Sequence, residues 1–400
     1  MSGEFAGRRS AGRNRWAQTD HRAADGDTTP APAPAPAEGV RQGTVKAGTL
    51  LAALAAPASM GVSGPSLALP EAARALGVGP AAAAWLMTAF GLGMAVGTPL
   101  LSATAGRRHG PAGVVRASAV LVVLGALLVL LAPTLPLAVA GRALEAAGAA
   151  GLNVAAFQLA GRDRSGRTPG VVAIGSAVGG TVGLFVGAAA AGAFGWRAAL
   201  VLPLLCLPFL RPVLRLASGS PTPGDDTSRT AGKRTGPPLD ILRDRRFLAA
   251  TGLMLALSTV NFFLLYAAPR RVTALTGWSA VETGAASSVA ALAGALLSWQ
   301  LVRAAPGLGP ARLRVVLVLG SAGALVLAVT APWAAAVLIG SGASALVTAG
   351  GQGLLTGAAT GGLPPARHGL AIGLFNLAFL IGVAAGPALA AFADQTVQFI

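Results

Sequence analysis

The sequence has very few of the residues on which soluble enzymes and disulfide-stabilised proteins depend. Only 11% of its 400 residues are charged, whereas soluble globular proteins carry about 25%. It has one cysteine, Cys206, which excludes a disulfide within the chain and a cysteine-based metal cluster. No glycine-rich phosphate loop ends in Gly-Lys-Ser/Thr, so we expect no ATP site, no enzyme activity and no cofactor. Its three histidines lie in a tail or in loops, which argues against a catalytic triad or a metal site: His21, His109 and His368.

Long apolar runs fill most of the chain instead. Hydrophobic residues make up 54% of the sequence, and glycine contributes 55 residues. A helix of roughly 20 apolar residues crosses a bilayer core about 30 Å thick. Eleven runs meet this requirement and are predicted to span a membrane: 48–69, 81–103, 114–133, 136–159, 170–194, 197–215, 247–268, 283–304, 313–331, 333–355 and 367–392.

Polar segments divide the chain into four regions. Residues 1–46 contain the run APAPAPA and are predicted to form a disordered, basic, proline-rich cytoplasmic tail. Residues 47–216 hold the first six spans, and residues 217–246 are predicted to be a flexible cytoplasmic linker. Residues 247–400 hold the other five spans. The chain is therefore predicted to build two helical bundles joined by the linker.

The arginines predict the orientation of these spans, because cytoplasmic loops carry an excess of positive charge. With a cytoplasmic N-terminus, the inside loops hold the linker and Arg107, Arg108, Arg116, Arg162, Arg164, Arg167, Arg303, Arg312, Arg314 and Arg367. The outside loops hold only Arg74, Arg197, Arg270 and Arg271. Abundant Gly, Ala and Arg with almost no Lys indicate a bacterial genome rich in GC. We therefore predict a multi-pass protein of the bacterial inner (plasma) membrane. The net charge of +16 is spread between apolar runs, so nucleic acid is not expected as a partner.

The two halves share a repeat with a constant offset of 199 residues. Gly110 and the Pro-Ala that follows it reappear at Gly309. The pair Gly183 and Gly187 reappears as Gly382 and Gly386. A unit repeated with one orientation is a parallel repeat, related by an axis along the membrane normal.

The same offset would place a counterpart of the sixth span near residue 396, but the sequence ends at Ile400. We therefore predict an all-α polytopic membrane protein built from two six-helix bundles in parallel repeat. About eleven spans are present in the sequence. The twelfth is either truncated or naturally absent. We expect a monomer in the lipid bilayer.

Three segments resemble the major facilitator superfamily, and most closely its drug:proton antiporters. They are LALPEAARALGVGPAAAAWLMTAFGLGMAVGTPLL at 67–101, RALEAAGAAG at 142–151 and GSAVGGTVGLFVGAAAAGAFGWR at 175–197. The resemblance extends over roughly residues 47–392. It implies a substrate site near the membrane midplane between the two halves, with spans one, four, seven and ten around it.

A cytoplasmic hinge motif of that family is matched in part by AGRRHGPAGV. Arg108 stands at the motif's arginine and Gly110 at its glycine, while Arg107 replaces an aspartate that latches the two halves in the family. The fifth span has Gly183 followed by leucine, where the family usually has Gly-Pro. Arg108, Gly110, Gly183 and Gly187 are our predicted conformational hinge. For the glycines, ordinary close packing of helices is the alternative.

Glu145 is the only acidic residue within a predicted span, and Arg142 lies three positions earlier on the same helix face. The family usually has a neutral glutamine at the position of Glu145, and its signature arginine corresponds to Arg142. Charges inside a bilayer are costly and are functional by default. We predict a proton-coupling pair, with Glu145 protonated in one conformation and bound to Arg142 in another. The alternative is a permanent ion pair that only positions the helix.

Polar and aromatic residues of the four central spans are the predicted substrate site: Ser59, Asn153, Asn261, Tyr266, Ser344 and Gln352. Asn153 and Gln352 occupy equivalent repeat positions, which would set two amides across a cavity. Alternatively, such amides only join helices by hydrogen bonds. Five residues are weaker candidates, of which the tryptophans are better explained as membrane-interface anchors: Trp85, Phe90, Phe185, Trp299 and Asn376.

These patterns predict a secondary active transporter. It would export a small amphipathic compound, such as a drug or antibiotic, in exchange for protons by alternating access. Two alternatives stay open. One is a facilitator or importer of a metabolite such as a sugar, which the scarcity of intramembrane acids permits. The other is a non-transporting membrane protein, which the replacement by Arg107 favours.

Overall fold

The structure is a computed structural model that describes residues 38–104, 110–161, 167–218 and 238–398, and residues 42–400 form one compact unit. All elements assigned in these ranges are helices. The first half holds α1 (Glu38–Ser63), η1 (Gly64–Leu67), α2 (Leu69–Ala75), α3 (Pro80–Ala83), α4 (Trp85–Thr104), α5 (Gly110–Leu131), α6 (Leu135–Ala160), α7 (Arg167–Phe194), α8 (Trp196–Leu200), η3 (Leu202–Cys206) and α9 (Leu207–Ser218). The second half holds η4 (Pro238–Arg243), α11 (Arg245–Thr276), α12 (Ala280–Thr330), α13 (Ala334–Thr360) and α14 (Pro365–Gln398).

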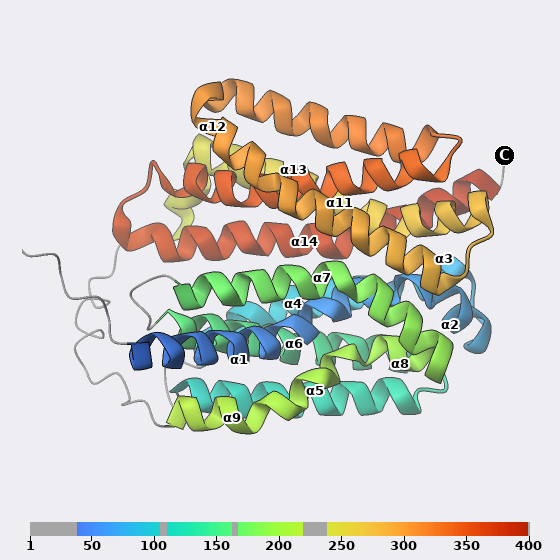
Figure 1. The fold of residues 1–400 in the computed structure, drawn as a ribbon, viewed down its shortest axis with the longest axis horizontal. Coiled ribbons are helices and arrows are strands. Elements are labelled where there is room, and N and C mark those ends of the chain that lie inside the picture. The colour runs from blue at the N-terminus through green and yellow to red at the C-terminus, as the bar shows by residue number, and fades with distance from the viewer. Residues whose placement is uncertain (1–37, 105–109, 162–166, 219–237, 399–400) are drawn as a thin grey trace, which may run out of the picture. The chain divides into compact units, whose positions relative to one another are not determined.

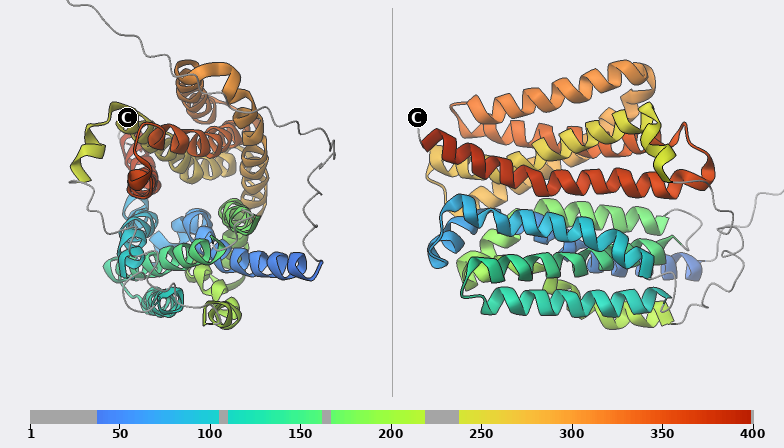
Figure 2. Two further views of the ribbon diagram at one scale, coloured as in Figure 1. Left: turned by 90° about the vertical axis from the view of Figure 1, so that its left-hand side faces the viewer. Right: turned by 180° about the vertical axis from the view of Figure 1, so that it is seen from behind.

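The predicted spans coincide with these helices, whose long members run side by side (Figures 1 and 2). In the described part of the chain, eight helices are long and apolar enough to cross a membrane, and α12 alone covers two predicted spans. The remaining two predicted spans correspond to α6 and to the broken run α8–η3–α9. The prediction of an all-helical membrane protein with about eleven spans is confirmed.

The packing of the helices repeats with the same 199-residue offset as the sequence. A Cβ atom built on Gly141 of α6 would lie 2.8 Å from the carbonyl oxygen of Gly125 on α5. A Cβ atom built on Gly340 of α13 would lie 2.8 Å from the carbonyl oxygen of Ala324 on α12. Both residues of the second pair lie 199 positions after those of the first. The two halves therefore use the same close helix contact, which only a residue without a side chain permits.

A backbone turn at Gly309 separates the two spans contained in α12. Its φ is 69° and its ψ is 163°, so the chain leaves the helical conformation there. Gly110, its counterpart 199 residues earlier, has a φ of 60° at the start of α5. Positive φ is easy for glycine and strained for other residues. The repeated Gly-Pro-Ala therefore marks the same turn into a helix in each half.

We expect Gly309→Ala to destabilise the protein by about 1 kcal/mol, because alanine at positive φ is strained. Gly307→Ala is the matched control, since neither glycine has an atom within 4 Å of its built Cβ and only Gly309 has positive φ. Thermal unfolding in detergent would compare the two. Equal unfolding temperatures would contradict the assigned backbone turn.

Two hydrophobic clusters join the halves, which meet where α14 packs on α4 and α12 packs on α7. One lies at the end that holds the turns 132–134 and 331–333, called here the predicted outer end. It brings Leu69 and Leu86 together with Tyr266. The other has members on α1, α4, α6 and α14 and joins Phe90 to Leu380. The halves are therefore packed together at the predicted outer end and in the middle.

The opposite end, called the predicted inner end, has a separate core in each half. One cluster contains Leu101 and Leu159 and has only first-half members among the described residues. Another contains Phe247 and Phe375, and its described members all belong to the second half. The hydrophobic packing that joins the halves is thus asymmetric between the two ends.

Candidate functional site

Arg142 and Glu145 form an ion pair in the interior of the first half. Both side chains are 0% exposed, and Arg142 Nη1 lies 2.7 Å from Glu145 Oε2. The residues are three apart on α6, so both project from the same face of the helix. Arg142 lies seven residues from the start of α6, about 10 Å along its axis. The pair is therefore enclosed by protein on all sides.

The guanidinium of Arg142 also bonds to two other helical segments. Nη1 donates to the carbonyl oxygen of Leu200 on α8 at 2.6 Å, and Nη2 donates to that of Gly61 on α1 at 2.7 Å. Among the described residues, Arg142 Nε and Glu145 Oε1 have no hydrogen-bond partner. Arg142 thus connects three segments far apart in the sequence, while one carboxylate oxygen of Glu145 accepts no hydrogen bond from a described residue.

Close packing of α5 against α6 encloses the backbone of Glu145. A Cβ atom on Gly125 would collide with the backbone nitrogen of Glu145 and would lie 2.6 Å from the carbonyl oxygen of Gly141. Only glycine at position 125 allows this approach. The sequence therefore brings α5 against the acid-bearing face of α6 with a residue that has no side chain.

Phe90 connects the ion pair to the interface between the halves. The carbon Cζ of Arg142 lies 4.1 Å from the centre of the Phe90 ring, a cation–π distance. Phe90 also belongs to the cluster with Leu380 of α14. At the next residue, a Cβ built on Gly91 would lie 2.7 Å from Ala384 Cα, so α4 and α14 are in close contact here. Phe90 thus contacts the charge pair through its ring and also packs in the cluster that contains Leu380 of α14.

The predicted substrate residues lie in different surroundings. Asn153 Oδ1 accepts a hydrogen bond from Ser176 Oγ at 3.2 Å, which joins α6 to α7. Tyr266 is 2% exposed and its hydroxyl accepts from Arg270 Nη1 at 3.3 Å. Ser344 is buried, and its Oγ has no hydrogen-bond partner in the described part of the chain. Three are half-buried: Ser59, Asn261 and Gln352. The hydrogen bond of Asn153 joins two helices, as the alternative explanation of this residue expects. Substrate binding by these six residues stays a prediction.

Among the weaker candidates, the two tryptophans are largely exposed. Trp85 is 54% exposed and Trp299 is 63% exposed, as expected of side chains that face lipid or its interface. Phe185 is exposed as well, and Asn376 is half-buried. Phe90 alone is fully enclosed.

The predicted hinge residues are only partly described. Arg108 lies outside the described residues, whereas Gly110 begins α5 with positive φ. Gly183 and Gly187 of α7 face α1 and η1, where built Cβ atoms would collide with Ser63 and with the backbone of Gly64. Close helix packing accounts for the glycines of α7. A hinge role remains a prediction.

Sequence reasoning missed the carbonyl groups that complete the site. The carbonyl oxygens of Gly61 and Leu200 carry no side-chain signal, because every residue has one. Sequence reasoning also ranked Phe90 low, although its ring contacts the arginine. In the described part of the chain, no group of three His, Cys, Asp or Glu residues is placed to hold a metal ion.

Comparisons with known proteins agree with this fold. The Major Facilitator Superfamily model matches residues 49–393. A search of curated proteins found no match. The fold is similar to a bacterial homologue of the human lysosomal transporter Spinster, solved in an inward-facing, unoccupied conformation, with a TM-score of 0.67 and 17% identity over 89% of this chain and 83% of that one.

Two further solved structures share the fold. The nucleoside transporter NupG has a TM-score of 0.66 and 12% identity, and the match covers 88% of this chain and 91% of that one. A POT family transporter in complex with a thioalcohol-conjugated peptide has a TM-score of 0.64 at the same identity and coverage. The family match spans nearly all of the predicted membrane region. This multi-pass, all-helical chain with a transporter fold belongs to the Major Facilitator Superfamily.

Proposed function

We propose that this chain is a secondary active transporter that exports a small amphipathic compound, such as a drug or antibiotic, in exchange for protons. The carrying observation is the Arg142–Glu145 pair. Its acid is the only one within a predicted span, and both side chains are fully buried. A buried charge that loses its partner is strongly destabilising. Protonation of Glu145 would therefore favour another arrangement of Arg142 and of the helices bonded to it.

Phe90 contacts both Arg142 and the interface between the halves, so a movement of the ion pair would be passed to that interface through its ring. When Glu145 is neutral, the guanidinium keeps the carbonyl oxygens of Gly61 and Leu200 but loses its counter-charge. A shift of Arg142 would move the Phe90 ring beneath it and disturb the packing of α4 on α14. Protonation of Glu145 would thus weaken the packing of α4 on α14, which has to change when the two halves rock against each other.

The asymmetric packing of the halves supports alternating access. Hydrophobic clusters join the halves at the predicted outer end and in the middle, and the described clusters of the predicted inner end are separate. The alternate conformation would open the cluster around Tyr266 and bring the inner cores together. The predicted cytoplasmic N-terminus agrees with the arginines at the predicted inner end: Arg116, Arg211, Arg215, Arg243, Arg245, Arg246, Arg303, Arg312, Arg314 and Arg367.

The test is proton flux in inside-out membrane vesicles with an imposed pH gradient. We expect a cationic dye or antibiotic to dissipate the gradient with the wild-type chain, and we expect Glu145→Gln to abolish this response. The glutamine keeps the shape of the side chain but cannot release a proton. Glu71→Gln, at the first turn of α2 and outside the predicted spans, is the matched control and should respond like wild type.

Other outcomes of this experiment would contradict parts of the proposal. Equal responses of wild type and Glu145→Gln would show that Glu145 is not the proton carrier. The compounds to be tested also include a nucleoside and a dipeptide, because two solved structures of similar fold are a nucleoside transporter and a transporter in complex with a conjugated peptide. A response to these alone would favour a metabolite transporter. No response from folded protein would favour the non-transporting alternative.

A further inference from the structure

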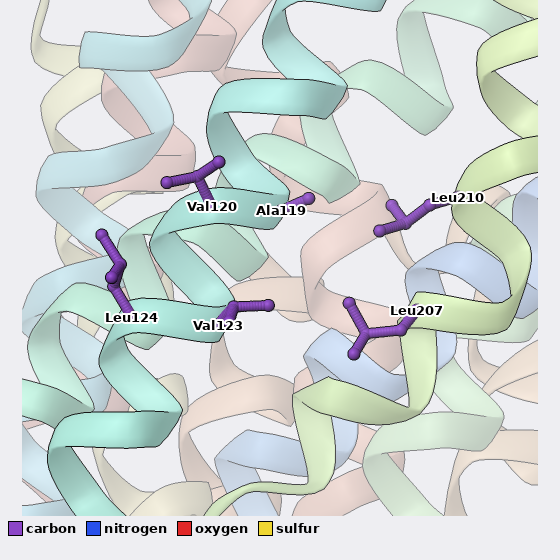
Figure 3. Close-up of a pocket in the computed structure, with 6 residues that line it drawn as sticks. All are labelled: Ala119, Val120, Val123, Leu124, Leu207 and Leu210. Carbon is purple, nitrogen blue, oxygen red and sulfur yellow. The ribbon is translucent and has the colours of Figure 1, made fainter.

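An apolar groove lies between α5 and α9 on the first half. Six side chains line it, four from α5 and two from α9, and Figure 3 shows them on either side of the opening: Ala119, Val120, Val123, Leu124, Leu207 and Leu210. Its volume is about 270 Å³, and every lining residue is apolar. Nothing in the lining could hold a polar solute by a side-chain hydrogen bond.

Three of the six lining residues are exposed and the other three are half-buried, although both helices belong to predicted spans. Val120 is 56% exposed, Leu124 is 48% exposed and Leu207 is 37% exposed. Inside a membrane, such side chains contact hydrocarbon. The opposite face of α5 packs on α6 and carries the buried Val115 and Val122. The groove therefore opens toward the acyl chains of the bilayer.

Three arginines stand at one end of this groove. Arg116 precedes Val120 by one helical turn on α5, and Arg211 directly follows Leu210 on α9. Arg215 follows one turn later. The two helices run in opposite directions, so these residues share the predicted inner end. All three are exposed, and none has a hydrogen bond or ion pair with a described residue.

The repeat does not keep the arginine of α5 that stands at this groove. The residue 199 positions after Arg116 is Val315. Long arginine side chains near a helix end reach toward the lipid headgroups. Anionic lipids are attracted to clustered basic residues on the cytoplasmic side of a membrane.

We propose that this groove is a binding site for an anionic phospholipid, with one acyl chain along the apolar lining and the phosphate at Arg116, Arg211 and Arg215. The occupant is a lipid because the lining is wholly apolar and opens to the bilayer. It is anionic because three cations without a described protein partner stand where the headgroup would lie. The site is separate from the buried pair on α6 and does not depend on the transported substrate.

The test is native mass spectrometry of the full chain in mild detergent, titrated with dioleoylphosphatidylglycerol or dioleoylphosphatidylcholine. We expect wild type to retain the anionic lipid preferentially. The triple variant Arg116→Gln/Arg211→Gln/Arg215→Gln should lose this preference, by about fivefold for each arginine removed. The matched control is Arg303→Gln/Arg312→Gln/Arg314→Gln, which removes three exposed arginines from the second half and should keep the preference.

A second variant tests the apolar lining of the groove without altering the charge of the protein. Ala119→Leu fills the groove and should lower retention of both lipids while the protein stays monodisperse and folded. The proposal is overturned if wild type shows no preference for the anionic lipid, or if the two triple variants lose it equally. A wild-type dimer that dissociates on Ala119→Leu would also overturn it, because the groove would then be an interface between two copies.

Discussion

Arg142→Met is expected to abolish transport and to lower the free energy of unfolding by about 3–5 kcal/mol, the usual cost of breaking a buried ion pair. Methionine is similar in length but cannot donate a hydrogen bond. It would leave Glu145 without a counter-charge and the carbonyl oxygens of Gly61 and Leu200 without their donor. Each of these groups is buried, so water cannot replace the guanidinium.

The single cysteine provides the measurement of stability. Cys206 is a free, fully buried thiol, so a thiol-reactive fluorophore would report unfolding as this side chain becomes accessible. Proton flux in vesicles would report transport on the same variants. The cysteine is unique in the chain, so the signal has one origin.

The double variant Arg142→Met/Glu145→Met separates a functional pair from a structural one. Replacing a buried ion pair by apolar residues is often neutral or stabilising. We expect the double variant to recover much of the stability lost in Arg142→Met while transport stays absent. If transport returned with stability, the pair would only position α6, and the proton-coupling role would be wrong.

Gly187→Leu is expected to destabilise the chain by about 3 kcal/mol, at the upper end of the cost of overpacking. A Cβ atom at this position would collide with the backbone of Gly64, and a backbone cannot rotate away as a flexible side chain does. The larger side chain would separate α7 from η1 at the predicted outer end. The unfolding temperature from Cys206 labelling would measure the loss.

Two matched variants make this prediction specific. Gly192→Leu changes the same helix at an exposed position with no atom within 4 Å of its built Cβ, so it should behave like wild type. Gly386→Leu should be as damaging as Gly187→Leu, because its Cβ would lie 2.5 Å from the backbone nitrogen of Phe263. Gly386 and Phe263 lie 199 residues after Gly187 and Gly64. If Gly187→Leu and Gly192→Leu behaved alike, the close contact would be disproved.

Much of the fold could be predicted because the bilayer constrains it strongly. A helix that crosses hydrocarbon needs a certain length of apolar chain, so runs such as 114–133 and 333–355 indicate spans directly. The constant offset of 199 then predicted two equivalent halves, and the packing at Gly141 and Gly340 has the same offset. The break within α12 falls at Gly309, in the Gly-Pro-Ala that the repeat singled out.

Only those parts of the candidate site that consist of unusual side chains could be predicted from the sequence. Glu145 stands out as the lone acid in a predicted span, and its spacing from Arg142 predicts contact on one helix face. The substrate residues are a different case. A serine or amide within a span can line a solute site or join two helices, and Asn153 bonds to Ser176 of the neighbouring helix.

The amino-acid sequence by itself determined the class of this protein, the number and order of its predicted spans, its repeat and the identity of its buried charges. These features depend on composition and on spacing along the chain, because an apolar segment of sufficient length forms a helix when it crosses the bilayer. Only the tertiary structure decided which groups surround Arg142 and which helices form the groove beside Arg116. Carbonyl groups and leucines occur everywhere in such a sequence. They become a site only where segments distant along the chain, such as Gly61, Phe90 and Leu200, are packed together.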